Sequence, residues 1–178
     1  MSNKATHWIE PVLARYERPL LQYALGLCGG DVDQARDIVQ DTFLRLTREE
    51  TPPAGDHLGP WLFTVCRNRA HDHHRKSSRI TYLETQAMED SPDDATSQPS
   101  VLLERKEHAD ALSRLIDRLP ANQREVIRLK FQHDLSYREI SEITTLSVGN
   151  VGFLLHTGLR RLRELFQQHE ALPERKIG

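Results

Sequence analysis

The sequence predicts an all-α protein made of two small helical domains joined by a flexible acidic linker. Apolar residues recur every three or four positions along most of the chain, which is the spacing of one helix face, and almost nothing alternates as a strand would. The segment from Glu84 to Ser100 is acidic and rich in Ser, Pro and Thr, a composition that favours disorder. We therefore expect a first domain over residues 8–79, a linker over 80–103 and a second domain over 104–170.

Three helices are expected in the first domain. The first runs from about Trp8 to Cys28 and ends at Gly29-Gly30, because glycine readily adopts the conformation that closes a helix. Asp31 caps the second helix, with Gln34 in the capping-box position. Its expected buried stripe is Ala35, Ile38, Val39, Thr42 and Leu46. A proline-rich loop follows, and the third helix is expected from Leu58 or Pro60 to Ser78. The buried side of that helix is expected to contain Leu58, Trp61, Leu62 and Val65, with Arg67, His71, His74 and Ser78 projecting outward near Phe63.

The second domain is expected to contain a helix-turn-helix. A helix carrying Ala109, Leu112, Leu115, Ile116 and Leu119 stops before Pro120, and a second runs from about Ala121 to Phe131. Ser136 and Glu139 then form a capping box that opens a short helix. After a turn at residues 144–146, Ser147 caps a last helix that reaches about Gln168. A short helix, a tight turn and a longer helix place the start of the longer helix in the DNA major groove.

The last helix has two distinct faces at 100° per residue. Its core side is expected to contain Val151, Leu155, Leu162 and Phe166. Phe153, His156, Thr157 and Arg160 fall near the opposite side, and Asn150 lies at the N-terminal end. An ordinary amphipathic bundle gives the same periodicity, but the two capping signals at this spacing favour the helix-turn-helix.

Charge is unevenly distributed along the 178 residues, although the net charge is only -2. Residues 59–79 contain five Lys/Arg against one Asp/Glu, a net +4, and residues 80–103 contain five acids and no Lys/Arg, a net -5. The basic segment attracts phosphate, and the acidic one repels DNA or shields its neighbour. No stretch approaches the roughly 20 apolar residues of a membrane span, no secretory signal begins the chain, and two cysteines are too few for a disulfide scaffold. We expect a cytoplasmic protein without membrane insertion.

Two groups of motifs resemble the extracytoplasmic-function (ECF) type of bacterial RNA polymerase sigma factor. Region 4 of that family is matched by Leu119-Pro120-x-x-Gln123-Arg124-Glu125, Leu135-Ser136-Tyr137-x-Glu139-Ile140, Ser147-x-Gly149-x-Val151 and Leu162-Arg163. Region 2 is matched by Asp37-x-Val39-Gln40-Asp41-Thr42-Phe43, Trp61-Leu62 and Arg67-Asn68-x-x-x-Asp72-x-x-Arg75. The resemblance implies a transcription initiation factor, neither an enzyme nor in need of a cofactor, that directs core polymerase to specific promoters. It also implies an anti-sigma factor as a further partner.

Three binding surfaces follow from the resemblance. Core polymerase is expected to bind Asp37, Gln40, Asp41 and Phe43. The melted minus-10 element is expected to bind Trp61, Phe63, Arg67, Asn68, His71 and Arg75, because basic groups follow phosphate and rings stack on bases. The minus-35 duplex is expected to bind Arg138, Ser147, Asn150, Phe153, His156, Thr157, Arg160 and Arg161. In the family, the loop at about 49–59 captures a flipped base.

The recognition helix departs from the family in one respect. Gly152, Leu154 and Thr157 stand where the family commonly has basic residues, so the front of this helix is unusually apolar. Phe153 there either meets a thymine methyl group or packs on another domain or partner, and the sequence favours neither.

Other functional classes fit the sequence less well. Cys66, His71, His73 and His74 lie close in sequence, but their helical directions diverge and no metal-binding motif accompanies them. No nucleotide-binding loop or catalytic pattern stands out. The alternative is a helix-turn-helix regulator that binds duplex DNA without acting as a sigma subunit.

Overall fold

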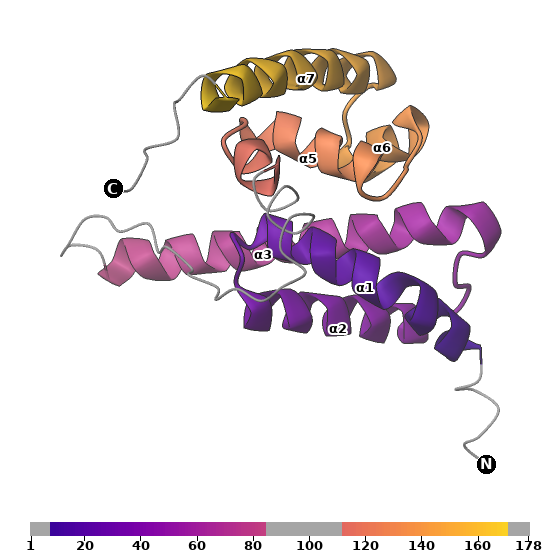
Figure 1. Cartoon of the computed structure of the whole chain (residues 1–178). Coiled ribbons are helices and arrows are strands. Elements are labelled where there is room, and N and C mark those ends of the chain that lie inside the picture. Colours follow the sequence, from indigo (N-terminus) through magenta and orange to yellow (C-terminus); the bar gives the residue numbers. More distant parts are fainter. Residues whose placement is uncertain (1–7, 85–111, 171–178) are drawn as a thin grey trace, which may run out of the picture. The chain divides into compact units, whose positions relative to one another are not determined.

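A computed structural model of the chain describes residues 8–84 and 112–170 (Figure 1). Its elements are α1 (Ile9–Leu27), α2 (Val32–Arg48), the short 3-10 helix η1 (Gly55–His57), α3 (Leu58–Glu84), a helical segment at 112–117, α5 (Ala121–Phe131), α6 (Tyr137–Thr144) and α7 (Val148–Glu170). No strand occurs in these two stretches, so the all-α prediction is confirmed. None of the helices described is long and apolar enough to cross a membrane.

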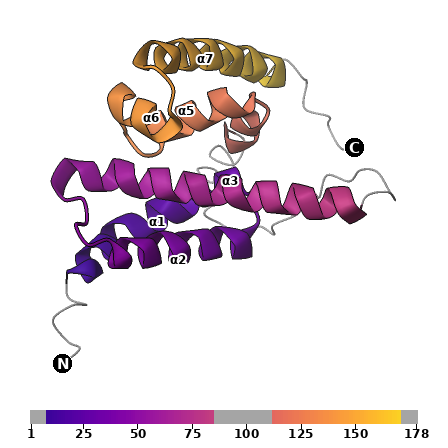
Figure 2. The ribbon, with the colours of Figure 1, turned by 180° about the vertical axis from the view of Figure 1, so that it is seen from behind.

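The helices α1, α2 and α3 all contact one another, as the two opposite views in Figures 1 and 2 show. Their shared core is fully closed to solvent at Leu20, Ala24, Ile38, Leu46 and Leu62. Tyr23 packs edge-on against Phe63, with the ring centroids 5.3 Å apart. Burial of this apolar surface is what holds the three helices together.

The ends of α1 and α2 form as the sequence predicts. Gly29 and Gly30 have φ angles of 64° and 95°, the conformation in which glycine is favoured at a helix end. The Asp31 carboxylate accepts a hydrogen bond of 3.0 Å from the backbone N–H of Gln34 and so caps α2. The predicted stripe of α2 is confirmed, because Ala35, Ile38, Val39, Thr42 and Leu46 are all buried.

The third helix is longer than predicted. It runs to Glu84 instead of ending at Ser78. The sequence after Ser78 is Arg-Ile-Thr-Tyr-Leu-Glu, which contains neither Gly nor Pro and so does not stop a helix. The predicted linker over 80–103 therefore begins inside α3, and the rest of it lies outside the described residues.

In the C-terminal half, α5 and α7 pack against each other. Leu115, Ile116 and Leu119 are buried, as predicted, together with Val126 and Ile127 of α5 and Val151 and Leu155 of α7. The Asp117 carboxylate accepts a hydrogen bond from the Arg128 guanidinium, which ties α5 to the segment before it. Contact between α5 and α7 is close at Gly158, where an added Cβ would lie 2.8 Å from Ile127 Cδ1.

Two side chains predicted to be in this core are exposed. Leu112 is 46% exposed and Phe166 is 48% exposed. The cause for Phe166 is length, because the 11 residues of α5 span about 16 Å and the 23 residues of α7 about 35 Å at 1.5 Å per residue. The end of α7 therefore extends beyond the helix that covers its core face.

The chain divides by its internal contacts into two compact units. The first contains α1, α2, η1 and α3 together with Arg138–Thr145, and the second contains the rest of the described C-terminal half. The domain boundaries given above stay a prediction.

Candidate functional site

The second helix presents a polar face away from its core. Asp37 and Gln40 are exposed, and the Asp41 side chain is 45% exposed. Asp41 Oδ2 lies 4.0 Å from Nε of Arg69 on α3. The sequence prediction of an exposed acidic face on α2 is confirmed, although Phe43 does not share it. Phe43 is only 7% exposed and lies on the side of α2 that faces α1, where it lines a groove.

Two surface hollows lie on either side of α2. The first, of about 460 Å³, is a groove toward α1 lined by Ile9, Leu13, Glu17, Leu21, Arg36, Val39, Gln40, Phe43, Leu44 and Thr47. The second, of about 330 Å³, lies toward α3 and is lined by Asp41, Leu44, Arg45, Arg48, Glu49 and Arg69. We call these the apolar groove and the arginine hollow. Leu44, 43% exposed, contributes to both and forms the ridge between them.

The arginine hollow was not predicted from the sequence. A signal was present in α2, because Asp37, Asp41 and Arg45 are spaced by four residues and so follow one side of the helix. Arg69 had no such signal, since its place beside Asp41 depends on how α3 packs against α2.

The outer face of α3 differs from the prediction at Phe63. This ring is 3% exposed and packs on Tyr23, so it is not available to stack on a DNA base. The prediction treated α3 as buried on one narrow side, but both α1 and α2 pack against it, and the buried arc therefore includes Phe63, Cys66 and Ala70.

A different stripe of α3 faces solvent. Asn68, His71 and Arg75 are exposed, and Trp61 and Arg67 are half-buried. Trp61, Asn68 and Arg75 follow one another at intervals of seven residues, which is about two helical turns. Arg75 also forms an ion pair of 2.9 Å with Asp72. The stripe thus combines an indole ring, an amide, an imidazole and a guanidinium, the groups that suit a nucleic acid strand.

The cysteine of α3 is part of the core. Cys66 is closed to solvent, and its burial raises the pKa of the thiol to about 12, so the thiol stays protonated at neutral pH. His74 lies elsewhere on the helix, with Nε2 3.1 Å from the backbone oxygen of Leu27. Within residues 8–84 and 112–170, no group of three or more His, Cys, Asp or Glu side chains is placed to hold a metal ion.

The start of α7 is capped by Ser147, and several of its side chains are exposed to solvent. Ser147 Oγ accepts a hydrogen bond of 3.2 Å from the backbone N–H of Asn150, which confirms the predicted cap. Phe153 is 64% exposed. Four further side chains predicted to contact the minus-35 duplex are exposed on α7: Asn150, His156, Arg160 and Arg161. Arg138 of α6 is 87% exposed at its side chain and pairs with Glu142 at 3.6 Å.

Thr157 does not belong to this open face. Its side chain is half-buried and turned toward α5, where Gln123 Nε2 donates a hydrogen bond of 3.4 Å to Thr157 Oγ1. The same hydroxyl donates to the backbone oxygen of Phe153 at 2.8 Å. The helical wheel placed Thr157 on the face opposite the core, but α5 and α7 approach closely at Gly158, and this side of α7 therefore contacts α5.

Comparison with known proteins identifies the family. Residues 12–80 match Sigma-70 region 2, and residues 109–162 match Sigma-70 region 4. A similar protein is the ECF RNA polymerase sigma factor SigL of Mycobacterium tuberculosis, 33% identical over 153 residues that cover 84% of this chain and 83% of the relative. The chain belongs to the ECF sigma factor family. As a member, it directs RNA polymerase to promoters and binds the core enzyme and promoter DNA.

Other similar proteins agree with this family. The ECF sigma factor SigM of Bacillus subtilis is 27% identical over 160 residues, which cover 90% of this chain and 96% of the relative. Among solved structures, the sigma factor RpoE bound to the anti-sigma factor NepR from Bartonella quintana shares the fold, with a TM-score of 0.71 and 24% identity over 91% of this chain and 98% of that one. Because regions 2 and 4 both match, these findings support a sigma factor over a helix-turn-helix regulator that lacks region 2.

Proposed function

We propose that each binding activity of this sigma factor belongs to a separate helix face. The outer face of α2 docks on core polymerase, the solvent-facing stripe of α3 holds the melted minus-10 strand, and the N-terminal half of α7 reads the minus-35 duplex. The observation that supports this division most strongly is on α2. There an acidic, polar face, Asp37, Gln40 and Asp41, stands outside the core within the stretch that matches region 2.

The α3 surface is proposed without Phe63. Trp61 is the remaining aromatic candidate for stacking, and Arg67 and Arg75 supply positive charge for phosphate. Asn68 and His71 complete the stripe as hydrogen-bonding groups. Any base flipped out of the duplex would be taken up near the loop before α3, which contains η1 and Gly55 at a φ of 58°.

On α7, Asn150, Phe153, His156 and Arg160 are proposed to face the duplex. The helix N-terminus, with its free backbone N–H groups, also favours phosphate. Arg138 and Arg161 are proposed to contact the sugar–phosphate backbone, which fixes position but reads no sequence. Ser147 acts through its cap, and Thr157 through its bond with Gln123, so neither is proposed to contact a base.

Three further properties are proposed from the family. The protein catalyses no reaction of its own and acts in the cytoplasm, where core polymerase is found. It is also held inactive by an anti-sigma factor. This proposal is supported by the similar sigma factor RpoE, whose structure is a complex with the anti-sigma factor NepR. An exposed phenylalanine such as Phe153 is an apolar group that a protein partner would cover.

Core docking is tested by reversing one charge on α2. We expect Asp37→Lys to weaken core polymerase binding by about 1 kcal/mol or more. The acidic face of α2 would meet basic groups of the polymerase, and a lysine at position 37 would repel them. Affinity for core enzyme is measured by fluorescence anisotropy in the absence of DNA. Glu164→Lys makes the same charge change on exposed α7 and is expected to bind core normally. Unchanged affinity of a folded Asp37→Lys protein contradicts the docking face.

A further inference from the structure

We propose that the arginine hollow receives an acidic side chain of core RNA polymerase. This inference rests on the proposed docking of the α2 face and adds a second point of contact to it. The hollow lies at the C-terminal half of α2, next to Asp41, and three guanidinium groups line it: Arg45, Arg48 and Arg69. The polymerase surface that meets α2 would therefore need opposite charges at two positions.

On the side of α2 that carries Asp41, the charges change sign toward the C-terminal end. In this stripe Asp37 and Asp41 come first, and Arg45 and Arg48 follow one and two turns after Asp41. One turn rises about 5.4 Å, so the acidic and basic halves lie side by side along a single helix. A partner that fits this stripe must present a basic group to the first half and an acidic group to the second. This pattern fixes the direction in which the partner lies.

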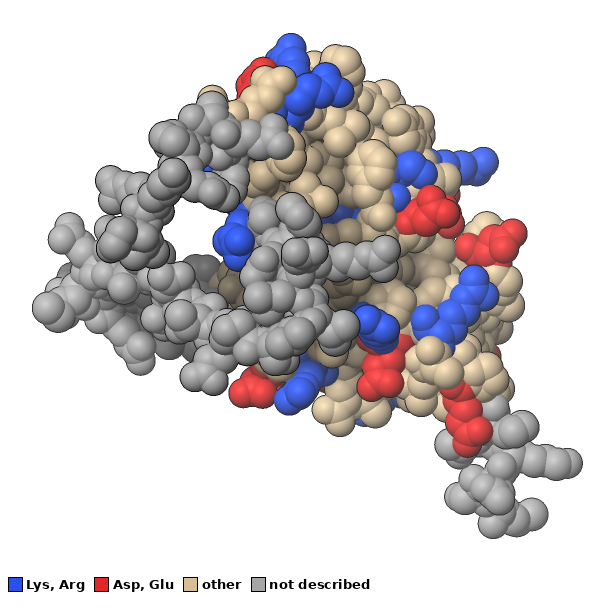
Figure 3. Space-filling view, viewed as in Figure 1, with Lys and Arg blue, Asp and Glu red and all other residues tan. Residues whose placement is uncertain are grey.

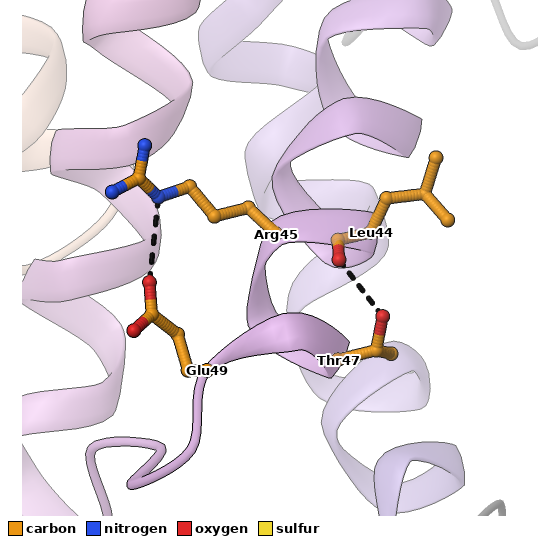
Figure 4. A network of polar contacts seen from close by, with 4 residues as sticks. All are labelled: Leu44, Arg45, Thr47 and Glu49. Carbon is orange, nitrogen blue, oxygen red and sulfur yellow. Dashed lines mark hydrogen bonds and ion pairs between the residues drawn. The ribbon is translucent and has the colours of Figure 1, made fainter.

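The guanidinium groups keep donors for a ligand. Arg45 Nε lies 3.4 Å from Glu49 Oε1, a contact drawn in Figure 4, and Arg69 Nε lies 4.0 Å from Asp41 Oδ2. Each of these pairs is made through Nε, whereas a guanidinium has five N–H donors in a planar fork. The side chains of Arg45 and Arg69 are 57% and 40% exposed, so their remaining donors can reach a carboxylate from outside.

The surroundings favour a protein over DNA as the partner. Asp41 and Glu49 also line the hollow, and they would repel a chain of phosphates. Figure 3 shows Lys/Arg and Asp/Glu side chains interspersed over the visible face of the first unit, with no single basic patch. Leu44 forms the exposed ridge at the rim, and in Figure 4 it points to a different side of α2 from Arg45. An apolar ridge beside charged groups is typical of protein interfaces.

Helix stability alone explains only part of this arrangement. Arg45 and Arg48 lie in the last turn of α2, where positive side chains interact favourably with the helix dipole. Arg69 comes from α3, and it reaches the hollow through the packing of α3 against α2, beside Asp41. A test therefore needs one change at the end of α2 and one on α3, with folding measured beside binding.

The experiment measures the affinity of the full-length protein for core polymerase without DNA. We expect Arg48→Glu to weaken binding roughly tenfold and Arg69→Gln to weaken it several-fold, with a shallower dependence of affinity on salt. Arg48→Lys keeps the charge and is expected to retain most of the affinity. Arg18→Glu, an exposed site on α1 outside both hollows, is the matched control and is expected to bind as the unchanged protein does.

Three outcomes overturn the proposal. If Asp37→Lys weakens core binding and folded Arg48→Glu and Arg69→Gln do not, the α2 face docks but the hollow takes no acidic group. If core affinity is unchanged and only promoter binding by the holoenzyme falls, the hollow binds DNA phosphate instead. If Asp37→Lys is also without effect, the proposed docking face itself fails. Should Arg48→Glu not fold, Arg69→Gln carries the same comparison.

Discussion

A single histidine is predicted to make the stability of the C-terminal half depend on pH. His133 follows α5, and burial, together with the positive charge of Arg128, lowers its pKa from 6.5 to about 4. The unfolded chain therefore binds a proton between pH 6.5 and 4 that the folded chain does not. The contribution of neutral His133 to the free energy of unfolding is thus fully present above about pH 6.5, and it falls as the pH drops toward 4. We expect a loss of roughly 1–2 kcal/mol, allowing for partial exposure to solvent.

The measurement compares the unchanged protein with His133→Gln, which cannot ionise. Urea unfolding followed by circular dichroism at pH 7 and pH 5 gives the free energy of unfolding for each. The unchanged protein is expected to lose more stability than the variant over this interval. Carboxylates that titrate near pH 4 affect both proteins equally, so parallel pH curves contradict the role given to His133.

Predictions for single residues were confirmed where the deciding partner lies close in the sequence. Asp31 and Ser147 cap their helices because a cap depends on residues three positions away. Phe63 and Thr157 were wrong for the opposite reason. Phe63 is buried because a second helix covers α3, and Thr157 turns inward because α5 approaches α7 closely. Contacts between helices distant in sequence are not encoded in a helical wheel.

At the scale of elements, the contact between α5 and α7 is predicted to depend on Gly158. An added Cβ would lie 2.8 Å from Ile127 Cδ1 and 3.3 Å from Gln123 Cβ, so a methyl group there requires the buried Ile127 side chain to rotate or the two helices to shift. We expect Gly158→Ala to destabilise the protein by about 1–3 kcal/mol, despite the better helix propensity of alanine. Thermal unfolding measured by circular dichroism reports the change.

Two further variants separate the clash from other effects of the substitution. Gly149 lies near the start of the same helix, and nothing stands within 4 Å of an added Cβ there. Gly149→Ala is therefore expected to leave stability unchanged or raise it by about 0.5–1 kcal/mol. Ile127→Val removes the methyl group that clashes, so the double variant is expected to recover part of the loss from Gly158→Ala. Strictly additive effects would contradict the contact.

Element boundaries followed from local signals in most places. The Gly29-Gly30 pair, Pro120 and the two prolines at 52 and 53 each mark the end of a helix or the start of a loop. The predicted end of α3 was wrong because a change in composition was taken as the signal, whereas the residues directly after Ser78 contain no helix-breaking Gly or Pro. The arginine hollow was not predicted, because it needs the packing of α3 against α2.

At the scale of the whole molecule, charge separation along the chain predicts a salt-sensitive restraint on DNA binding. The net +4 of residues 59–79 directly precedes the net -5 of residues 80–103, most of which lie outside the described residues. Attraction between charges across solvent falls off within a Debye length of about 8 Å at physiological salt. Shielding of the basic segment by the acidic one is therefore expected to be partial and to weaken as salt rises.

Neutralising the acidic segment tests this restraint. Replacing Glu89, Asp90, Asp93 and Asp94 with Gln or Asn removes four of its five acids. The isolated protein is then expected to bind single-stranded promoter DNA more tightly at low salt, with the gain disappearing at high salt. A variant with the same residues in scrambled order keeps the charge and is expected to bind as the unchanged protein does. If neutralisation changes nothing at any salt concentration, charge in this segment does not restrain the protein. That outcome favours the anti-sigma factor proposed above, because a protein interface of about 1,600 Å² would be largely insensitive to salt.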